Sequence, residues 1–285
     1  MPTADVTARF CADLMAGLAD SGVELVIVSP GSRNTPLTLA SLAEPRLRAV
    51  SIRDERSAGF MALGHAKVSG VPAAVICTSG SAATHYYPAI VEADQSTTPL
   101  IALTSDRPRS LRDTFAPQTM NQVDLFGSHV VSSLDIDVDT ADGRDTGRTL
   151  VASAMGPIRG PVHGNLPFDE PLTPTVAIDA SPTGSATVPA HSTGPSEPRP
   201  ELADAERMLV VVSGPLRPQA ATALAALAHA WQAPVLADAQ TTIDGSTMIE
   251  YPDLIAGARL ADGTPALDAL RPDHIIRIGP LPTSK

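Results

Sequence analysis

The chain has 285 residues, which at roughly 150 residues per domain suggests two domains. Hydrophobic residues make up 43% and charged residues 18%, and this composition excludes wholesale disorder. The net charge of −11 disfavours nonspecific nucleic-acid binding, and the 3% of aromatic residues disfavours a base-stacking surface. Two cysteines, the lack of a signal-peptide pattern and the lack of a long apolar run predict a protein of the reducing cytoplasm without a membrane span.

Short apolar runs alternate with helix-spaced segments over the first 170 residues. The expected strands are residues 23–28, 49–52, 73–77, 100–104 and 162–166. The expected helices include residues 6–18, 55–68, 82–93 and 146–155. Because these strands are almost continuously apolar, they are typical of strands buried on both faces. The pattern therefore predicts βαβ units and an α/β fold with a parallel sheet.

A second, shorter α/β unit is expected after a linker. Residues 171–206 are rich in Pro, Ser and Thr and show no apolar period, which is typical of an extended connector. Beyond it, we expect strands at 208–214, 234–238 and 274–279 and helices at 218–231, 254–260 and 266–270. No crossover helix follows the last strand, so we expect residues 207–285 to be an incomplete domain of a longer protein.

The loop after the first expected strand, residues 29–36 (SPGSRNTP), is a candidate ligand site. In open α/β sheets, ligands bind beyond the carboxyl ends of the strands. Thr35 is expected to cap the next helix, with Pro36 at its first position. Ser32, Arg33 and free backbone N–H groups would then bind an anion. A plain strand-to-helix turn explains the same pattern equally well.

Glu55 lies where the second expected strand runs into a helix, in the segment IRDERS. An acid in the first helical turn interacts favourably with the helix dipole, so a purely structural role is the simpler interpretation. A functional role requires that Glu55 be partly buried, with a heterocycle nitrogen as its partner.

The third expected strand ends in the small-residue turn CTSGSA, residues 77–82. Small side chains at a helix N-terminus allow a flat ring or an anion to approach closely. Cys77 belongs to the apolar run, so we expect it to be a core residue rather than a nucleophile.

The fourth expected strand ends in the segment TSDRP, which leaves Arg107 at the same edge of the sheet. A protein with a net charge of −11 repels anions at long range, so an anionic ligand would need local arginines such as Arg33 and Arg107. The structural alternative is an ion pair between Arg107 and Asp106. The chain contains no P-loop, G-x-G-x-x-G, H-E-x-x-H or C-x-x-C motif, and we expect no metal ligands in it.

Together these motifs resemble the N-terminal portion of the 2-succinyl-5-enolpyruvyl-6-hydroxy-3-cyclohexene-1-carboxylate synthases, which are thiamine-diphosphate-dependent transferases of menaquinone biosynthesis. The matching segments are PGSRNTPLTLA, RDERSAGFMALGHAKVSG, VICTSGSAATHYYPAIVEA, LIALTSDRPRSL and APQTMNQVDLFG. The resemblance is dense over residues 20–170 and collinear from 208 to 285. It implies a pyrimidine-binding domain at 1–170, a partial central domain at 207–285, and an absent diphosphate-binding domain.

The resemblance also implies roles for particular residues. Glu55 matches the catalytic glutamate, which shares a proton with a ring nitrogen of thiamine diphosphate. The implied cofactor-binding residues are Pro30, Glu55, Thr78, Ser79 and Gly80. The implied substrate-binding residues are Ser32, Arg33, Arg107, Gln118 and Lys285. The implied reaction decarboxylates 2-oxoglutarate and joins the remaining carbon chain to isochorismate, in a cytoplasmic homo-oligomer (a dimer or tetramer).

The chain departs from the family in lacking the G-D-G…N-N motif that holds Mg²⁺ and the diphosphate. The resemblance implies that these ligands belong to a missing C-terminal domain and that the cofactor lies between two subunits. We therefore expect the chain to be inactive alone. Two alternatives remain open: a different thiamine-diphosphate decarboxylase or carboligase, and a non-catalytic α/β binding module. Arg107 and Gln118 argue against the first alternative, and the retention of Glu55 argues against the second.

Overall fold

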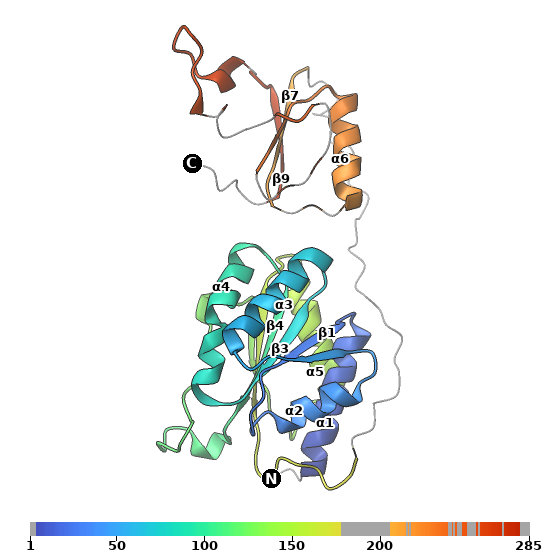
Figure 1. The fold of residues 1–285 in the computed structure, drawn as a ribbon, viewed down its shortest axis with the longest axis vertical. Helices are drawn as coiled ribbons and strands as arrows, with labels where there is room; N and C mark the ends of the chain where they lie inside the picture. Colours follow the sequence, from blue (N-terminus) through green and yellow to red (C-terminus); the bar gives the residue numbers. More distant parts are fainter. Residues whose placement is uncertain are drawn as a thin grey trace. The chain divides into compact units, whose positions relative to one another are not determined.

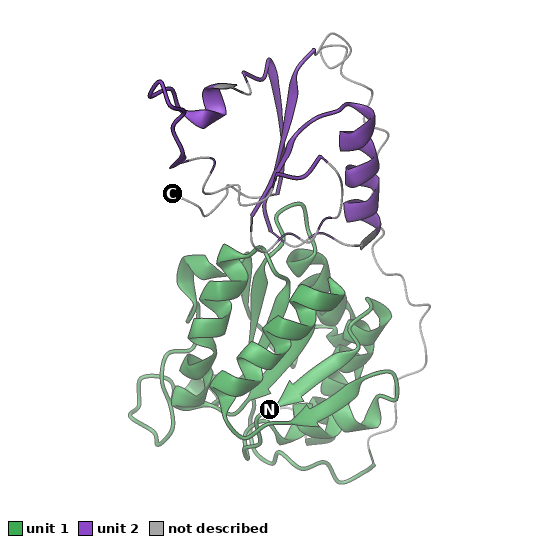
Figure 2. Cartoon of the chain, turned by 45° about the horizontal axis from the view of Figure 1, so that its top comes forward, with its two compact units in different colours: residues 1–191 green, residues 192–285 purple. Residues whose placement is uncertain are grey.

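A computed structural model describes most of the chain as two compact units, residues 1–191 and 192–285 (Figure 2). The described residues are 4–177, 206–214, 216, 218–238, 241, 243, 247–249, 255, 257–269 and 271–279. Most of the linker expected at 171–206 lies outside them, as does Lys285. No helix in the described ranges has the length and hydropathy needed to span a membrane.

The first unit contains a six-stranded sheet with the order β2-β1-β3-β4-β6-β5, in which every neighbouring pair is parallel. Its strands are β1 (Leu25–Val28), β2 (Arg48–Ser51), β3 (Ala73–Cys77), β4 (Leu100–Asp106), β5 (Ser132–Asp135) and β6 (Pro161–Pro167). The α/β fold with a parallel sheet that the sequence predicts is therefore confirmed.

Helices cover both faces of this sheet (Figure 1). They are α1 (Ala4–Asp20), α2 (Thr35–Ala43), α3 (Glu55–Ser69), α4 (Tyr87–Gln95) and α5 (Gly143–Ala154), with short 3₁₀ turns η1 (Gly80–Tyr86), η2 (Arg109–Leu111) and η3 (Gly127–His129). Alternate residues of a strand point to opposite faces. Accordingly, Val26 packs in the core shared with α1, α2 and α5, and Ile27 packs in the core shared with α3 and α4.

The differences from the sequence prediction have local physical causes. Strand β5 has the polar sequence SSLD and lies half-buried at the sheet edge, so it carries no apolar signal. The helix expected at 82–93 is divided: a 3₁₀ turn runs to Tyr86 and α4 begins at Tyr87, because a proline near its start favours the first turn of a new helix. Helix α5 begins three residues earlier than expected, because the Asp142 side chain accepts a hydrogen bond from the backbone N–H of Asp145 at 2.8 Å.

The second unit contains a three-stranded parallel sheet with the order β8-β7-β9. Its elements are β7 (Met208–Val212), α6 (Pro218–Ala230), β8 (Val235–Ala237), η5 (Ala266–Ala269) and β9 (His274–Ile278). The three expected strands and the alanine-rich helix are present. Of the helix expected at 254–260, Ile255 and Gly257 are helical, but the expected end is wrong because Arg259 pairs with Pro265 in an isolated bridge. The helix expected at 266–270 is a short 3₁₀ turn.

Candidate functional site

The predicted site residues of the first unit follow four neighbouring strands. The loop containing Ser32 and Arg33 follows β1, Glu55 follows β2, Thr78 follows β3 and Arg107 follows β4. The strands are adjacent in the order β2-β1-β3-β4 and parallel, so all four segments meet at the carboxyl edge of one sheet. The sequence motifs are thus brought together at the edge where α/β proteins bind their ligands.

Glu55 is the first residue of α3, but it is not the residue that caps this helix. Asp54 is the cap: its carboxylate accepts hydrogen bonds from the backbone N–H and the hydroxyl of Ser57, at 2.7 and 2.6 Å. The Glu55 side chain is half-buried, and its carboxylate has no hydrogen bond or ion pair to any part of the chain that the structure describes. Glu55 does lie in the first helical turn, as the structural interpretation from sequence requires, so its position in the helix does not decide between the two roles.

Two buried side chains interact electrostatically with Glu55. Burial raises the pKa of the Cys77 thiol and of the Tyr86 hydroxyl, and the negative charge of Glu55 raises both pKa values further. The Tyr86 ring packs against α3 at Gly59, four residues after Glu55. Cys77 is fully buried in the core, as expected, so it is not accessible as a nucleophile.

The turn after β3 is in close contact with the loop after β1. A side chain at Gly31 would collide with the side chain of Thr78, so only glycine allows this approach. Gly80, in the turn after β3, adopts a positive φ of 83°, a backbone conformation that favours glycine. Ser79 and Gly80 are buried, and Thr78 is half-buried. The close approach of the two loops therefore depends on glycine, and both loops lie at the same edge of the sheet as Glu55.

Gln118 lies against the same turn, although 39 residues separate it from Ser79 in the sequence. Its side-chain amide donates a hydrogen bond to the Ser79 carbonyl at 3.1 Å, and the Ser79 hydroxyl donates one to the Gln118 carbonyl at 3.1 Å. The structure therefore brings a predicted substrate residue next to the predicted cofactor turn.

The two predicted anion-binding arginines converge on one carboxylate. Arg33 is 5% exposed; its Nη1 donates to the Phe168 carbonyl at 2.9 Å and its Nη2 to Glu170 Oε1 at 2.8 Å. Arg107 Nη1 lies 3.9 Å from the same Glu170 oxygen, and Arg107 Nε is buried without a hydrogen bond. The two guanidinium groups thus lie within ion-pair distance of one carboxylate, which belongs to the chain itself.

Two details of the sequence interpretation are wrong. The guanidinium partner of Asp106 is Arg112, at 3.2 Å, whereas Arg107 donates only its backbone N–H to Asp106. Thr35 does not cap α2: the helix begins at Thr35 itself, and its hydroxyl donates to the Ser32 carbonyl at 2.7 Å. The Ser32 side chain remains exposed, and so does Pro30.

A buried polar network beneath the site was not predicted. Gln122 is fully buried; its Oε1 accepts the Gly80 N–H at 2.7 Å, and its Nε2 donates to the Ser105 carbonyl at 3.2 Å and to Asn165 Oδ1 at 3.0 Å. Asn165 in turn donates to the carboxylates of Asp106 and Asp135, at 3.0 and 2.9 Å. Gln122 lies in the segment APQTMNQVDLFG, which was singled out as a whole, but only the fold reveals its partners.

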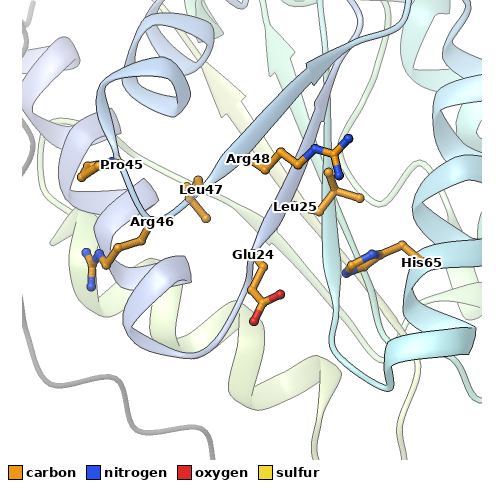
Figure 3. Close-up of a pocket in the computed structure, with 7 residues that line it drawn as sticks. All are labelled: Glu24, Leu25, Pro45, Arg46, Leu47, Arg48 and His65. Atoms are coloured by element: carbon orange, nitrogen blue, oxygen red, sulfur yellow. The ribbon is translucent and has the colours of Figure 1, made fainter.

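A groove of about 470 Å³ lies at the opposite edge of the sheet, where β1 and β2 begin. It is lined by Glu24, Leu25, Pro45, Arg46, Leu47, Arg48 and His65 (Figure 3). None of the predicted site residues lies there, so this groove is separate from the candidate site. Within the ranges that the structure describes, no group of three or more His, Cys, Asp or Glu side chains is placed to hold a metal ion.

Comparison with known proteins identifies the same region. The thiamine pyrophosphate enzyme N-terminal TPP binding domain matches residues 9–125, a range that contains every predicted site residue of the first unit. The chain is also similar to curated 2-succinyl-5-enolpyruvyl-6-hydroxy-3-cyclohexene-1-carboxylate synthases. It is 39% identical to the one from Geobacillus kaustophilus over 99% of this chain and 52% of the relative.

Other relatives carry the same name. The synthase from Chloroflexus aurantiacus is 38% identical over 97% of this chain and 49% of the relative. The synthase from Roseiflexus castenholzii is 50% identical over 58% of this chain and 30% of the relative. The chain thus spans about half the length of the first two relatives.

Proposed function

We propose that this chain, which is similar to the thiamine pyrophosphate enzymes over residues 9–125, forms the pyrimidine-binding part of a synthase that joins decarboxylated 2-oxoglutarate to isochorismate. The product would be 2-succinyl-5-enolpyruvyl-6-hydroxy-3-cyclohexene-1-carboxylate, an intermediate of menaquinone biosynthesis. The observation that carries this proposal is the half-buried carboxylate of Glu55, which lies at the ligand-binding edge of the sheet without a partner among the described residues.

The residues near Glu55 fit the aminopyrimidine ring of thiamine diphosphate. Pro30, Thr78, Ser79 and Gly80 would hold the ring, because they lie on the two loops that meet at the same edge of the sheet as Glu55. When bound, the cofactor supplies a thiazolium that stabilises the carbanion formed on decarboxylation. The task of Glu55 is to share a proton with a ring nitrogen in a site from which water is largely excluded.

The proposed substrates are dicarboxylates, and the positive charges near the site suit them. Arg33 and Arg107 already contact a carboxylate oxygen, and the exposed Ser32 hydroxyl and the Gln118 side chain lie on the neighbouring loops. We assign these four residues to isochorismate binding. Lys285, which lies outside the described residues, is a fifth candidate.

The remaining parts of the site belong, in this proposal, to the half of the relatives that the chain does not match. That half would supply the Mg²⁺ and diphosphate ligands, and residues 207–285 would begin the central domain. A cofactor held between two subunits requires a homo-oligomer, and the enzyme would work in the cytoplasm. The chain alone is then expected to form no product from 2-oxoglutarate and isochorismate, even with thiamine diphosphate and Mg²⁺ present.

The test joins this chain to the C-terminal half of the Geobacillus kaustophilus synthase and measures product formation from the two substrates. Glu55→Gln should lower kcat at least 100-fold, because a proton-sharing group typically contributes about 10²–10⁴-fold. Glu92→Gln is the matched control, since Glu92 is a half-exposed acid paired with Lys67 near the far end of α3. Full activity of Glu55→Gln, with both variants folded by circular dichroism, would contradict the proposal.

A further inference from the structure

The carboxylate of Glu170 forms ion pairs with the two arginines that we assign to substrate binding. It lies three residues beyond the end of β6, and its side chain is 70% exposed. Its Oε1 is 2.8 Å from Arg33 Nη2 and 3.9 Å from Arg107 Nη1. A substrate carboxylate that used both guanidinium groups would need the position that this oxygen occupies.

Glu170 is not needed to hold Arg33 in place. The Arg33 side chain is 95% buried, and its Nη1 is fixed by the Phe168 carbonyl at 2.9 Å. Glu170, by contrast, is mostly exposed to water, and a substrate carboxylate that takes its place keeps the buried Arg33 charge paired. The contact can therefore be broken at small cost while the arginine keeps its orientation.

We infer that Glu170 is a resident carboxylate that the substrate must displace, and that it thereby sets the selectivity of the anion site. The inference rests on the proposed function, which assigns Arg33 and Arg107 to the substrate. A tethered carboxylate has an effective concentration on the order of millimolar. A free monocarboxylate at lower concentration cannot displace it, whereas a dicarboxylate with further contacts to Ser32 and Gln118 can.

The contact itself is tested without substrate, by recording the side-chain Nε–Hε NMR resonances of Arg33 and Arg107 in the 285-residue chain. Glu170→Gln should shift the Arg33 resonance, and the control Glu92→Gln, which removes a 2.6 Å ion pair to Lys67, should not. An unchanged Arg33 resonance in Glu170→Gln would overturn the inference whatever the substrate is.

Displacement is tested in the chain joined to the C-terminal half of the Geobacillus kaustophilus synthase, with and without Glu170→Gln, by titration with isochorismate and with propionate, a monocarboxylate probe. We expect Glu170→Gln to bind isochorismate about two- to fivefold more tightly, because the substrate no longer competes with a carboxylate on the exposed side of the pair. Propionate should bind measurably only to Glu170→Gln, and Glu92→Gln should behave as the unmodified chain does.

The other outcomes separate this inference from the proposed function. Equal or weaker isochorismate binding by Glu170→Gln would overturn the role of Glu170 and leave the proposed substrate intact. If only propionate bound, and only to Glu170→Gln, the role of Glu170 would stand and isochorismate would be the wrong substrate. Binding of neither probe to either protein would overturn both.

Discussion

Replacement of Gln122 by methionine should destabilise the first unit strongly, although Gln122 touches no proposed ligand. The change removes three hydrogen bonds, each worth about 1 kcal/mol, and leaves the Gly80 N–H buried without an acceptor, which costs about a further 1–2 kcal/mol. The apolar side chain of methionine recovers part of this loss. We expect a net decrease of about 3 kcal/mol in the free energy of unfolding, a large share of the roughly 5–15 kcal/mol of a typical domain.

Urea unfolding of the chain, followed by circular dichroism, measures this decrease. Gln95→Met is the matched control, because Gln95 is exposed at the end of α4 and its change should cost less than about 0.5 kcal/mol. Since Gly80 belongs to the proposed cofactor turn, Gln122→Met should also weaken thiamine diphosphate binding in the joined enzyme. A Gln122→Met variant as stable as Gln95→Met would refute the view that the buried network holds this turn.

Three further predictions concern the stability and charge of the first unit. Gly147→Ala should lower the free energy of unfolding by about 1–3 kcal/mol in urea titrations, because its methyl group would collide with the α1 backbone at Leu14. Three arginines hold the pKa of Asp20 well below its usual value, so its stabilising contribution is full above about pH 4 and declines as the pH falls further; Asp20→Asn should flatten this part of the stability–pH curve. Burial lowers the pKa of His163 to about 4, so its imidazole should stay neutral at pH 5 in ¹⁵N NMR spectra, and protonation there would contradict the structure.

The sheet of the first unit could be predicted because most of its strands are buried on both faces. Strand β3 is apolar throughout and β4 is apolar over its first four residues, so the sequence alone indicates them. Strand β5 could not be found in this way, because an edge strand with half its surface exposed tolerates serine and aspartate. Because β5 was not predicted, the network beneath the site was not predicted either, since Asp135, a member of that network, is the last residue of β5.

The part of the candidate site that could be predicted consists of residues that directly follow the carboxyl ends of strands. Arg33 and Arg107 each follow a buried strand, and parallel topology alone brings them to one edge. The structural alternative, an ion pair between Arg107 and Asp106, is wrong, because neighbours in sequence do not have to pair in the fold; the guanidinium of Arg112 pairs with Asp106 instead. The sequence does not indicate a role for Glu170, because an exposed acid has no distinctive pattern. Its role follows only from its contacts with Arg33 and Arg107, which are far away in the sequence.

The most direct test of the account is an experimental structure of this chain joined to the C-terminal half of a relative, with thiamine diphosphate bound. We predict that a carboxylate oxygen of Glu55 lies within hydrogen-bond distance, about 2.6–3.2 Å, of a nitrogen of the aminopyrimidine ring. A ring bound elsewhere, with Glu55 facing only water, would contradict the assignment of this edge of the sheet as the active site.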